Sequence, residues 1–199
     1  MNLWADYLKH SSDRIMNKWK HYIPAYERHF HSFVNKNVTI IEIGCGLGGS
    51  LQMWKRFFGP HAQIIGIDNL PACKFLEEDQ IQIRIGEQQD QHFLQSTIDE
   101  FGPPDIIVDD GSHIMSHVIA SFQFLYPKMS KNGVYWVEDL QTAYWEEYEG
   151  GLRNKYTFIE LCKNYIDELN ADHTRNALPP TEFTRTTMSM HFYDSVVVF

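Results

Sequence analysis

Short apolar runs alternate with helical patterns along the middle of the chain, and this alternation limits the possible fold more than any other feature. Five of the runs resemble strands, and they are VTIIEIG, AQIIGID, IQIRIGEQQD, PPDIIVDDG and NGVYWVEDL. Continuous apolar strands separated by helices are typical of a parallel sheet that is covered on both faces. The pattern therefore predicts a doubly wound, Rossmann-like α/β fold with a mostly parallel sheet.

The two ends of the chain depart from this alternation. Aromatic residues recur every three or four positions from Trp19 to Phe30, which predicts a helical face that Pro24 divides into two short helices. We expect a short N-terminal helical segment over residues 1–34 and one domain over residues 35–199. In that domain we also expect helices near 72–79 and 156–169. The runs FTRTTMSMHFY and SVVVF predict a C-terminal antiparallel hairpin with its turn at 194–195.

Composition excludes several classes of protein. A chain of 199 residues that is 43% hydrophobic can bury a core without cross-links. Its net charge of −9 disfavours nucleic acid as the main partner, because such proteins usually present a basic face. No apolar run is long enough to span a bilayer, and the N-terminus lacks the apolar stretch of a signal peptide, so we expect a cytoplasmic protein with no membrane contact. The three cysteines have no CxxC spacing, which argues against disulfides and structural zinc.

A glycine-rich turn follows the first strand and opens a helix. It extends from Glu42 through Gly44 and Gly46 to Ser50. Glycines allow a ligand to approach the backbone closely, and a helix N-terminus offers free N–H groups. Asp68 ends the second strand, where a doubly wound sheet presents a carboxylate to ribose hydroxyls. This order predicts an adenosine-containing ligand; the alternative is a turn that only permits close packing of helix and strand.

Glu42 distinguishes between two such ligands. It lies two residues before the first glycine, a position that resembles the first motif of class I S-adenosylmethionine (SAM) methyltransferases. A pyrophosphate would gain nothing from this charge, whereas a sulfonium ligand with an ammonium group would. After the third strand, Gln88, Gln89 and Asp90 form the loop where such enzymes hold adenine. Alternatively, this loop only caps the helix that follows it.

Two pairs of acids end two consecutive strands, Asp109 with Asp110 and Glu138 with Asp139. Neighbouring strands lie about 4.8 Å apart, so Asp110, Glu138 and Asp139 can converge on one point. Carboxylates this close need a counter-charge, and Mg²⁺ is the usual cation for oxygen ligands. Adjacent strand residues point to opposite sides, so we assign Asp110 to the metal and Asp109 to the cofactor side. Alternatively, the acids are separate strand-end residues that bind backbone N–H groups.

His113 follows Asp110 by three residues. A nearby metal would keep its imidazole neutral and would acidify a hydroxyl, so His113 is the candidate general base for O-methylation. The alternatives are a helix-cap contact and a metal ligand. Tyr144 and Trp145 follow the second acid pair and are candidates for an apolar wall against a sugar, or for ordinary packing aromatics.

These motifs resemble the metal-dependent sugar O-methyltransferases of the macrocin and mycinamicin type. The matching stretches are EIGCGLGGSLQMW, IIGID, VDDGSH, GVYWVEDLQTAYW, HFYDSVVVF and the N-terminal HYIPAYERHF. The resemblance implies a class I methyltransferase fold over residues 35–199, SAM as methyl donor, and Mg²⁺ at the positions of Asp110, Glu138 and Asp139. It also implies a histidine base matching His113, and homo-oligomers in which the N-terminal segment, here residues 1–34, helps to cover active sites. Relatives often have GDQ after the third strand, where this chain has Gly86-Glu87-Gln88.

The expected function is SAM- and Mg²⁺-dependent O-methylation of a hydroxyl on a sugar or a glycosylated natural product, with a vicinal diol as the expected acceptor group. Three alternatives remain open at this point. They are a metal-independent SAM methyltransferase of a phenolic or other small molecule, a non-catalytic SAM-binding module, and an NAD-linked oxidoreductase.

Overall fold

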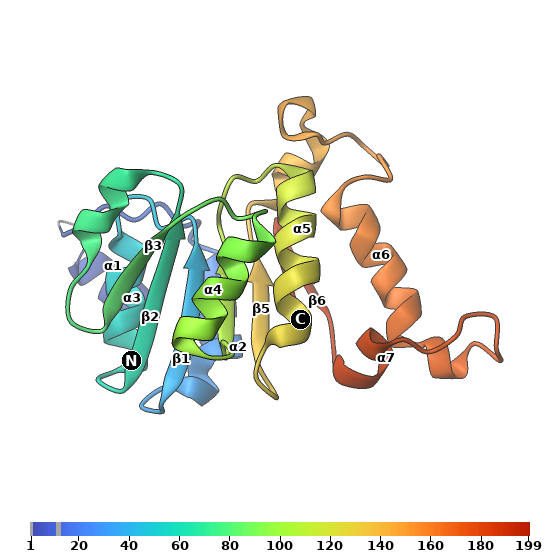
Figure 1. The fold of residues 1–199 in the computed structure, drawn as a ribbon, viewed down its shortest axis with the longest axis horizontal. Coiled ribbons are helices and arrows are strands. Elements are labelled where there is room, and N and C mark those ends of the chain that lie inside the picture. Colours follow the sequence, from blue (N-terminus) through green and yellow to red (C-terminus); the bar gives the residue numbers. More distant parts are fainter. Residues whose placement is uncertain (1, 11–12) are drawn as a thin grey trace.

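A computed structural model describes residues 2–10 and 13–199, and in it seven strands form one sheet in the order β3-β2-β1-β4-β5-β7-β6 (Figure 1). The strands are β1 (Val38–Ile43), β2 (Ala62–Asp68), β3 (Ile81–Ile85), β4 (Ile106–Asp109), β5 (Val134–Val137), β6 (His191–Tyr193) and β7 (Val196–Val198). Strands β1 to β5 pair in parallel, and β7 pairs antiparallel with both β5 and β6. The predicted mostly parallel sheet and the C-terminal antiparallel hairpin are thus confirmed.

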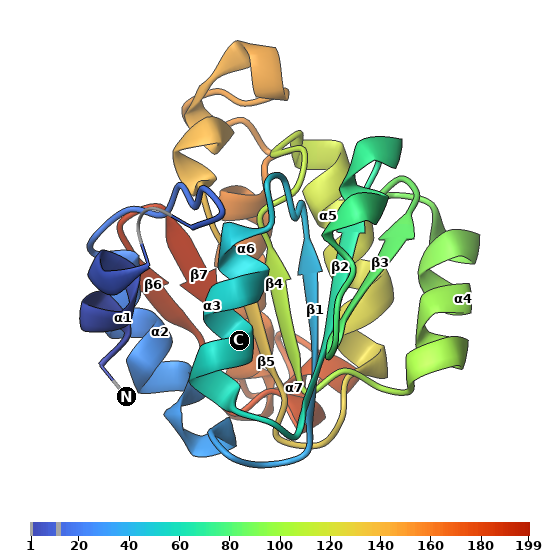
Figure 2. The same ribbon diagram turned by 90° about the vertical axis from the view of Figure 1, so that its left-hand side faces the viewer.

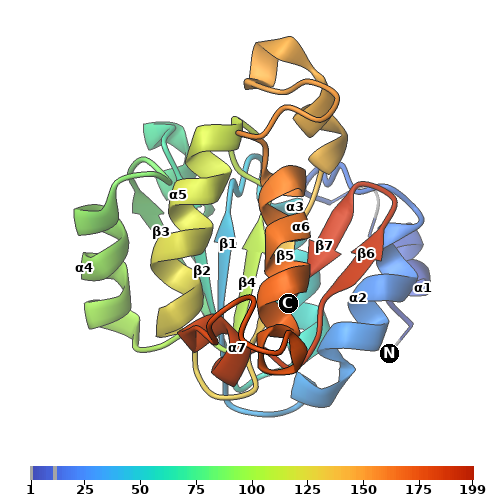
Figure 3. The ribbon, with the colours of Figure 1, turned by 90° about the vertical axis from the view of Figure 1, so that its right-hand side faces the viewer.

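Helices cover both faces of this sheet. The α-helices are α1 (Leu3–Lys9), α2 (Tyr22–Phe30), α3 (Gly49–Phe58), α4 (Gln91–Phe101), α5 (Met115–Leu125), α6 (Phe158–Leu169) and α7 (Glu182–Thr186). Short 3₁₀ helices are η1 (His31–Phe33), η2 (Pro71–Leu76), η3 (Tyr126–Lys128), η4 (Leu140–Tyr144), η5 (Glu146–Tyr148) and η6 (Ala171–His173). Figure 2 shows α1, α2 and α3 on one face, and Figure 3 shows α4, α5 and α6 on the other. Each face has its own buried apolar cluster, as the continuous apolar strands predict.

The register of the sheet aligns the strand ends that matter for function. Ile43 of β1 lies beside Ile67 of β2 and beside Asp109 of β4, and Asp109 lies beside Val137 of β5. The glycine turn, Asp68 and both acid pairs therefore leave the sheet at nearly the same level. Among the described residues, no helix is both long and apolar enough to cross a bilayer.

The structure corrects two predictions about helices. Pro24 does not divide the aromatic segment, because it lies in the first turn of α2, where backbone N–H groups have no partner within the helix. The stretch near 72–79 forms the 3₁₀ helix η2, which ends at Leu76. The other expected helix, near 156–169, is confirmed as α6.

The C-terminal region contains less strand than its β-branched composition suggests. Residues 182–186 form helix α7, which begins with a reciprocal capping box between Thr181 and Thr184. Strand β6 is consequently only three residues long, although the predicted turn at 194–195 is present between β6 and β7. Local capping thus outweighs the strand propensity of the threonines.

The N-terminal segment packs on the first face of the sheet. Leu3, Tyr22, Tyr26 and Phe30 are fully buried in the same cluster as α3. The backbone of Arg14 and Ile15 passes the start of α3 so closely that a Cβ on Gly49 would lie 2.4 Å from the carbonyl oxygen of Ile15. The division at residues 34 and 35 stays a prediction.

His29 on α2 leads to a prediction about pH. Its Nε2 lies 2.9 Å from the hydroxyl of Tyr193, and burial, followed by the charges of His191 and Arg28, lowers the pKa of His29 to about 4. The unfolded chain, with a histidine pKa of about 6.5, therefore binds more protons, so stability is lost as the pH falls from about 6.5 toward 4. Urea unfolding at about pH 7 and pH 5 should show a smaller loss for His29→Gln than for the native chain. The same change at the exposed His61 should leave the loss unaltered; equal losses in both variants would contradict the assignment.

Candidate active site

Loops at the carboxyl ends of the parallel strands form the candidate site. A cavity of about 130 Å³ opens there, lined by Ile43, Gly44, Ile67, Asp68, Asn69, Gly86, Glu87, Gln88, Gly111 and Ser112. The segment that follows β5 rises beyond the strand ends, at the top of Figure 2. Ligands of doubly wound sheets bind at this edge, so the location agrees with the sequence prediction.

Gly44 allows the glycine turn and the first acid loop to meet. Its φ is +82°, and a Cβ at this position would lie 2.1 Å from the backbone oxygen of Asp110. Gly46 also has a positive φ, of +48°, and faces open space. A side chain at Gly44 would therefore push the glycine turn away from the backbone of Asp110, whereas Gly46 has room for a ligand beside it.

Asp68 is held at the cavity by backbone N–H groups. Its Oδ2 accepts a hydrogen bond of 3.0 Å from the N–H of Gly46, and its Oδ1 accepts one of 2.9 Å from Leu70. The carboxylate is partly exposed in the cavity wall. This is the placement expected for a residue that accepts hydrogen bonds from ribose hydroxyls. That role stays a prediction.

Gln88 in the cavity wall is hydrogen-bonded to Asp109, which is buried behind it. The amide oxygen of Gln88 accepts from the N–H of Ser112 at 2.6 Å, and its Nε2 donates to Asp109 at 3.2 Å. Asp109 also accepts from Ser121 at 2.8 Å, while burial raises the pKa of Asp109 to about 6. Asp109 is thus not part of the cavity wall, and it reaches the cofactor side only by orienting Gln88.

The other two loop residues differ from each other. Asp90 caps helix α4, because its Oδ1 accepts from the N–H groups of His92 and Phe93. The amide oxygen of Gln89 is buried without a hydrogen-bond partner in the described structure. The capping alternative therefore accounts for Asp90, and the adenine contact predicted for these residues stays a prediction.

Glu42 and Ser50 lie beneath the glycine turn rather than in the cavity wall. Glu42 is fully buried, and it accepts hydrogen bonds from Ser50 at 2.8 Å and from Trp54 at 3.2 Å. Burial raises the pKa of Glu42, although the charge of Lys18 opposes this. Protein donors thus already engage both oxygens of Glu42, and its expected contact with SAM stays a prediction.

Asp110, His113 and Asp139 gather at the end of β4 and β5. The Nε2 of His113 lies 3.8 Å from Oδ1 of Asp110 and 3.9 Å from Oδ2 of Asp139. Potential ligand atoms of these three side chains all lie within 4.8 Å of one another, and all three side chains are partly exposed. His113 and Asp139 have left-handed backbones, with φ of +59° and +56°, and α5 begins only at Met115. A tight turn thus positions His113, whereas Asp139 lies directly before the 3₁₀ helix η4.

Lys18 inserts into the acids from the N-terminal segment. Its ammonium group contacts Asp110 at 2.6 Å, Glu138 at 2.5 Å and Glu42 at 3.2 Å, and its side chain is 3% exposed. Burial alone would lower the pKa of Lys18, but the charges of Asp110 and Glu138 raise it well above its ordinary value. The buried ammonium group of Lys18 therefore already binds three carboxylates at once.

Glu138 lies behind the cluster that faces His113. Its second oxygen accepts from Tyr26 and, at 2.7 Å, from Trp136, so protein donors engage both of its oxygens. On the other acid of this pair, Asp139, Oδ1 accepts from Tyr22 at 2.7 Å. The three predicted carboxylates do gather, but Glu138 joins Asp110 through Lys18 and is not in the group that Asp110 and Asp139 form with His113.

A short aromatic row extends from His113. The ring of Tyr148 lies 6.3 Å from that of His113, and the ring of Trp145 lies 6.0 Å from that of Tyr148. Tyr144 is half exposed on η4, and Trp145 follows it with 45% of its surface exposed. Neither side chain is buried against a helix. A contact of both with the sugar acceptor stays a prediction.

No sequence pattern singles out Lys18 or Tyr148, and Tyr22 and Tyr26 fall within the aromatic helical face predicted from Trp19 to Phe30. The two tyrosines are indeed buried, but their hydroxyls also bind Asp139 and Glu138. Their spacing of four on a helix could have suggested a shared face, whereas no pattern around Lys18 indicates its destination.

The residues present suit a hard divalent cation. Carboxylate oxygens of Asp110 and Asp139 face one partly exposed point beside an imidazole. When all four are ionised, the acids Glu42, Asp110, Glu138 and Asp139 carry more negative charge than Lys18 balances, and burial raises the pKa of Asp110 well above its ordinary value, so a second cation would favour the ionised acids. Oxygen ligands with room for solvent are the arrangement that Mg²⁺ prefers.

Known proteins resemble the chain closely. No protein-family model matches it. The chain is 37% identical over 201 residues to the 8-demethyl-8-alpha-L-rhamnosyl tetracenomycin-C 2'-O-methyltransferase of Streptomyces olivaceus, covering 95% of this chain and 52% of that protein. It is 38% identical over 192 residues to the mycinamicin VI 2''-O-methyltransferase of Micromonospora griseorubida, covering 88% of this chain and 46% of that protein.

Solved structures agree with these relatives. The MycE methyltransferase from the mycinamycin pathway, in complex with Mg and SAH (S-adenosylhomocysteine), matches with a TM-score of 0.86 and 33% identity, over 98% of this chain and 52% of that one. A MycE complex that also contains mycinamycin VI matches with a TM-score of 0.85 and 34% identity, covering 98% of this chain and 51% of that one. The chain thus spans about half the length of the curated relatives it matches. It has the class I methyltransferase fold and is homologous, over nearly its whole length, to about half of a sugar O-methyltransferase of the mycinamicin and macrocin type.

Proposed function

We propose that the chain carries a SAM- and Mg²⁺-dependent O-methyltransferase activity toward a sugar hydroxyl of a glycosylated acceptor. The observation that carries this proposal is the imidazole of His113 between the carboxylates of Asp110 and Asp139, next to the strand-end cavity. Relatives named as O-methyltransferases of a rhamnosyl tetracenomycin and of mycinamicin VI support it, as does the similar MycE structure in complex with Mg and SAH.

The cofactor is proposed to lie over the glycine turn. Asp68 would accept hydrogen bonds from the ribose hydroxyls, and Gln88 and Gln89 would lie beside adenine. Gly44 contacts the backbone of Asp110, which brings the reactive end of the cofactor toward the acids. Glu42 and Ser50 support the turn from below. SAM supplies the electrophilic methyl group to this arrangement.

The metal is proposed to bind Asp110 and Asp139, with Glu138 and Lys18 completing the charge balance behind them. Mg²⁺, when bound, supplies positive charge that lowers the pKa of an acceptor hydroxyl. Tyr22 holds Oδ1 of Asp139, and Lys18 holds Oδ2 of Asp110, so each acid presents its other oxygen toward His113. This division of oxygens orients both acids toward the same point.

His113 is proposed to take the proton from the acceptor hydroxyl at Nε2. Burial lowers the pKa of His113, although Asp139 and Glu138 oppose this, so the imidazole is neutral and able to accept a proton at neutral pH. Once protonated, it would be stabilised by the adjacent carboxylates of Asp110 and Asp139. Tyr148 and Trp145, together with Tyr144, would hold one face of the sugar.

A second candidate function is methyl transfer without a metal. It is favoured by Lys18, whose ammonium group already supplies a counter-charge to Asp110 and Glu138. In that case His113 would still act as the base, and the acids would serve a structural role.

Divalent metal removal distinguishes the two candidates. We expect transfer of labelled methyl from SAM to an L-rhamnoside in the presence of Mg²⁺, loss of transfer in excess EDTA, and recovery when Mg²⁺ is restored. Transfer that persists in EDTA would support the metal-independent enzyme. Binding of SAH in calorimetry without any transfer would instead indicate a binding module, and binding of NAD would indicate an oxidoreductase.

The proposal includes a homo-oligomer in the cytoplasm, in which residues 1–34 help to cover an active site. Light scattering during size-exclusion chromatography tests the assembly, for which a mass of one chain would be the contradicting result.

A further inference from the structure

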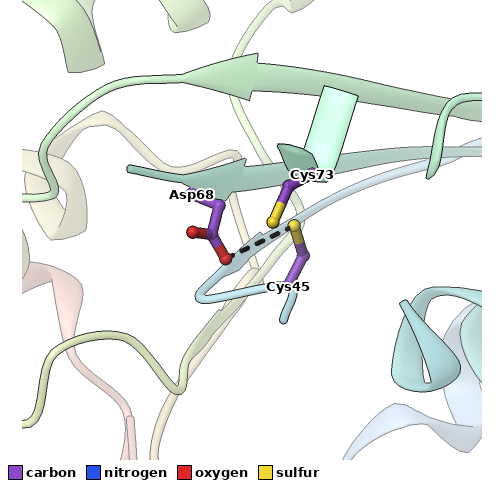
Figure 4. A group of neighbouring side chains, drawn as sticks. All are labelled: Cys45, Asp68 and Cys73. Atoms are coloured by element: carbon purple, nitrogen blue, oxygen red, sulfur yellow. Dashed lines mark hydrogen bonds between the residues drawn. The ribbon is translucent and has the colours of Figure 1, made fainter. Parts of the chain in front are cut away.

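Two cysteines and an acid from three separate segments meet at the edge of the candidate cofactor cavity. Figure 4 shows Cys45 from the turn after β1, Asp68 from the end of β2 and Cys73 from η2, with their side chains pointing toward one another. The sulfur of Cys45 lies 3.7 Å from Oδ2 of Asp68, and that of Cys73 lies 3.4 Å from the backbone oxygen of Gly46. One potential ligand atom from each side chain lies within 4.8 Å of the other two.

The two thiols are buried in the protein, and the group is accessible only where Asp68 lines the cavity. Cys45 and Cys73 are 3% and 5% exposed, whereas Asp68 is partly exposed in the cavity wall. Burial, followed by the charge of Asp68, raises the pKa of both thiols, so they are protonated in the absence of a cation. An ion would therefore reach the sulfurs from the cavity, past Asp68.

The donor set selects a class of ion. Thiolate sulfur favours Zn²⁺ and similar soft cations over Mg²⁺, and zinc accepts sulfur together with carboxylate oxygen in tetrahedral sites. Metal–ligand distances of about 2.0–2.3 Å place tetrahedral ligand atoms within about 4 Å of one another. The observed separations are close to this, so small side-chain rotations would complete the geometry.

We propose that Cys45, Asp68 and Cys73 form a binding site for a thiophilic divalent metal ion of the Zn²⁺ class. Each thiol gives its proton to solvent as its sulfur–metal bond forms, Asp68 contributes one oxygen, and solvent occupies the remaining position. This site differs from the group formed by Asp110 and Asp139, which offers oxygen ligands and an imidazole but no sulfur. The sequence spacing does not indicate it, because the cysteines meet only through the fold.

The site has a consequence for the cofactor, and this part of the inference rests on the proposed function. Asp68 is the residue proposed to accept hydrogen bonds from the ribose hydroxyls, and it also accepts one from the N–H of Gly46 in the glycine turn. A metal ion that takes an oxygen of Asp68 would remove both contacts. Metal and cofactor should therefore compete, and each should weaken the binding of the other.

Cadmium provides a direct test, because Cd²⁺–thiolate bonds absorb in the ultraviolet and carboxylates or histidines do not produce this band. Cd²⁺ is titrated into the reduced protein with excess Mg²⁺ present to occupy the oxygen site. We expect saturation at one equivalent for the native chain. Cys73→Ser and Cys45→Ser should weaken the binding at least about tenfold, because each loses one of two thiolate ligands.

The third cysteine provides the matched control. Cys162 is also fully buried, but it lies in α6, within the apolar cluster on the opposite face of the sheet. Cys162→Ser should keep the full band. An absent band in the native chain, or an unchanged band in a Cys73→Ser protein with native circular dichroism, would overturn the proposed site.

Calorimetry with SAH separates this inference from the proposed function. In metal-free buffer, SAH binding tests the cofactor site alone. At a Cd²⁺ concentration that fills the site of the native chain but not that of Cys73→Ser, with excess Mg²⁺ present, we expect the SAH affinity of the native chain to fall roughly tenfold to a hundredfold, the range for losing charge-assisted hydrogen bonds, and that of Cys73→Ser to stay constant. A cadmium band without any change in SAH affinity would establish the metal site and contradict the shared use of Asp68.

Discussion

Replacing Lys18 by methionine is expected to lower the free energy of unfolding by about 3–5 kcal/mol in metal-free buffer, the usual cost of removing one partner from a buried ion pair. The ammonium group contacts Glu42, Asp110 and Glu138 with only 3% of the side chain exposed. Without it, these carboxylates would repel one another in a site that excludes most water. Urea unfolding in EDTA measures the change.

Mg²⁺ is expected to restore part of this stability. An ion that binds only the folded state stabilises it by an amount that grows with the logarithm of one plus the ratio of the ion concentration to its Kd, and the Lys18→Met variant has one more uncompensated negative charge to bind the ion. The midpoint of unfolding should therefore rise more with Mg²⁺ in Lys18→Met than in the native chain. Equal responses would mean that Lys18 and the metal do not share the same acids.

Lys163 offers a control for this experiment. It pairs with Glu160 one turn earlier on α6, and 54% of its side chain is exposed. Exposed pairs contribute about 0–1 kcal/mol, so Lys163→Met should have little effect and no dependence on Mg²⁺. A loss at Lys163 as large as that at Lys18 would show that burial of the acid cluster is not the cause.

The sheet and the position of the site follow from local patterns. Apolar runs such as VTIIEIG define parallel strands, and polar residues directly after them must emerge at one edge. Asp68, Asp110 and Asp139 could be placed by this rule, because Asp68 ends its strand and the other two come just after theirs. What the rule does not supply is the direction of each side chain, and Glu138 consequently lies farther inside than expected.

Contacts between distant segments are the part that the sequence does not reveal. Lys18 reaches Glu138 across 120 positions, and Cys45 meets Cys73 only because η2 folds back over the glycine turn. Neither pair has a characteristic spacing in the sequence, because tertiary packing of distant segments, and not a local repeating pattern, brings the two residues together. The tyrosines of α2 are an intermediate case, in which the helical face was visible but the polar partners of the hydroxyls were not.

Replacing His113 by alanine is expected to reduce methyl transfer by about 10²–10⁴-fold, the usual contribution of a general base. The affinities for SAH and Mg²⁺ should change little, because a base acts on the acceptor proton and not on the cofactor. Rates with saturating SAM, together with calorimetry, measure both. If His113 is instead a metal ligand, the Mg²⁺ affinity should fall together with the rate.

His117 is the matched control for this variant. It lies on α5 close to the site, where its Nδ1 is 3.0 Å from the hydroxyl of Ser112, but it is not part of the group around Asp110 and Asp139. His117→Ala should therefore retain most of the rate. If both variants lose the rate equally, the effect belongs to the packing of the loop between β4 and α5. A large loss at His113 alone, with Mg²⁺ binding intact, would assign the proton transfer to its imidazole.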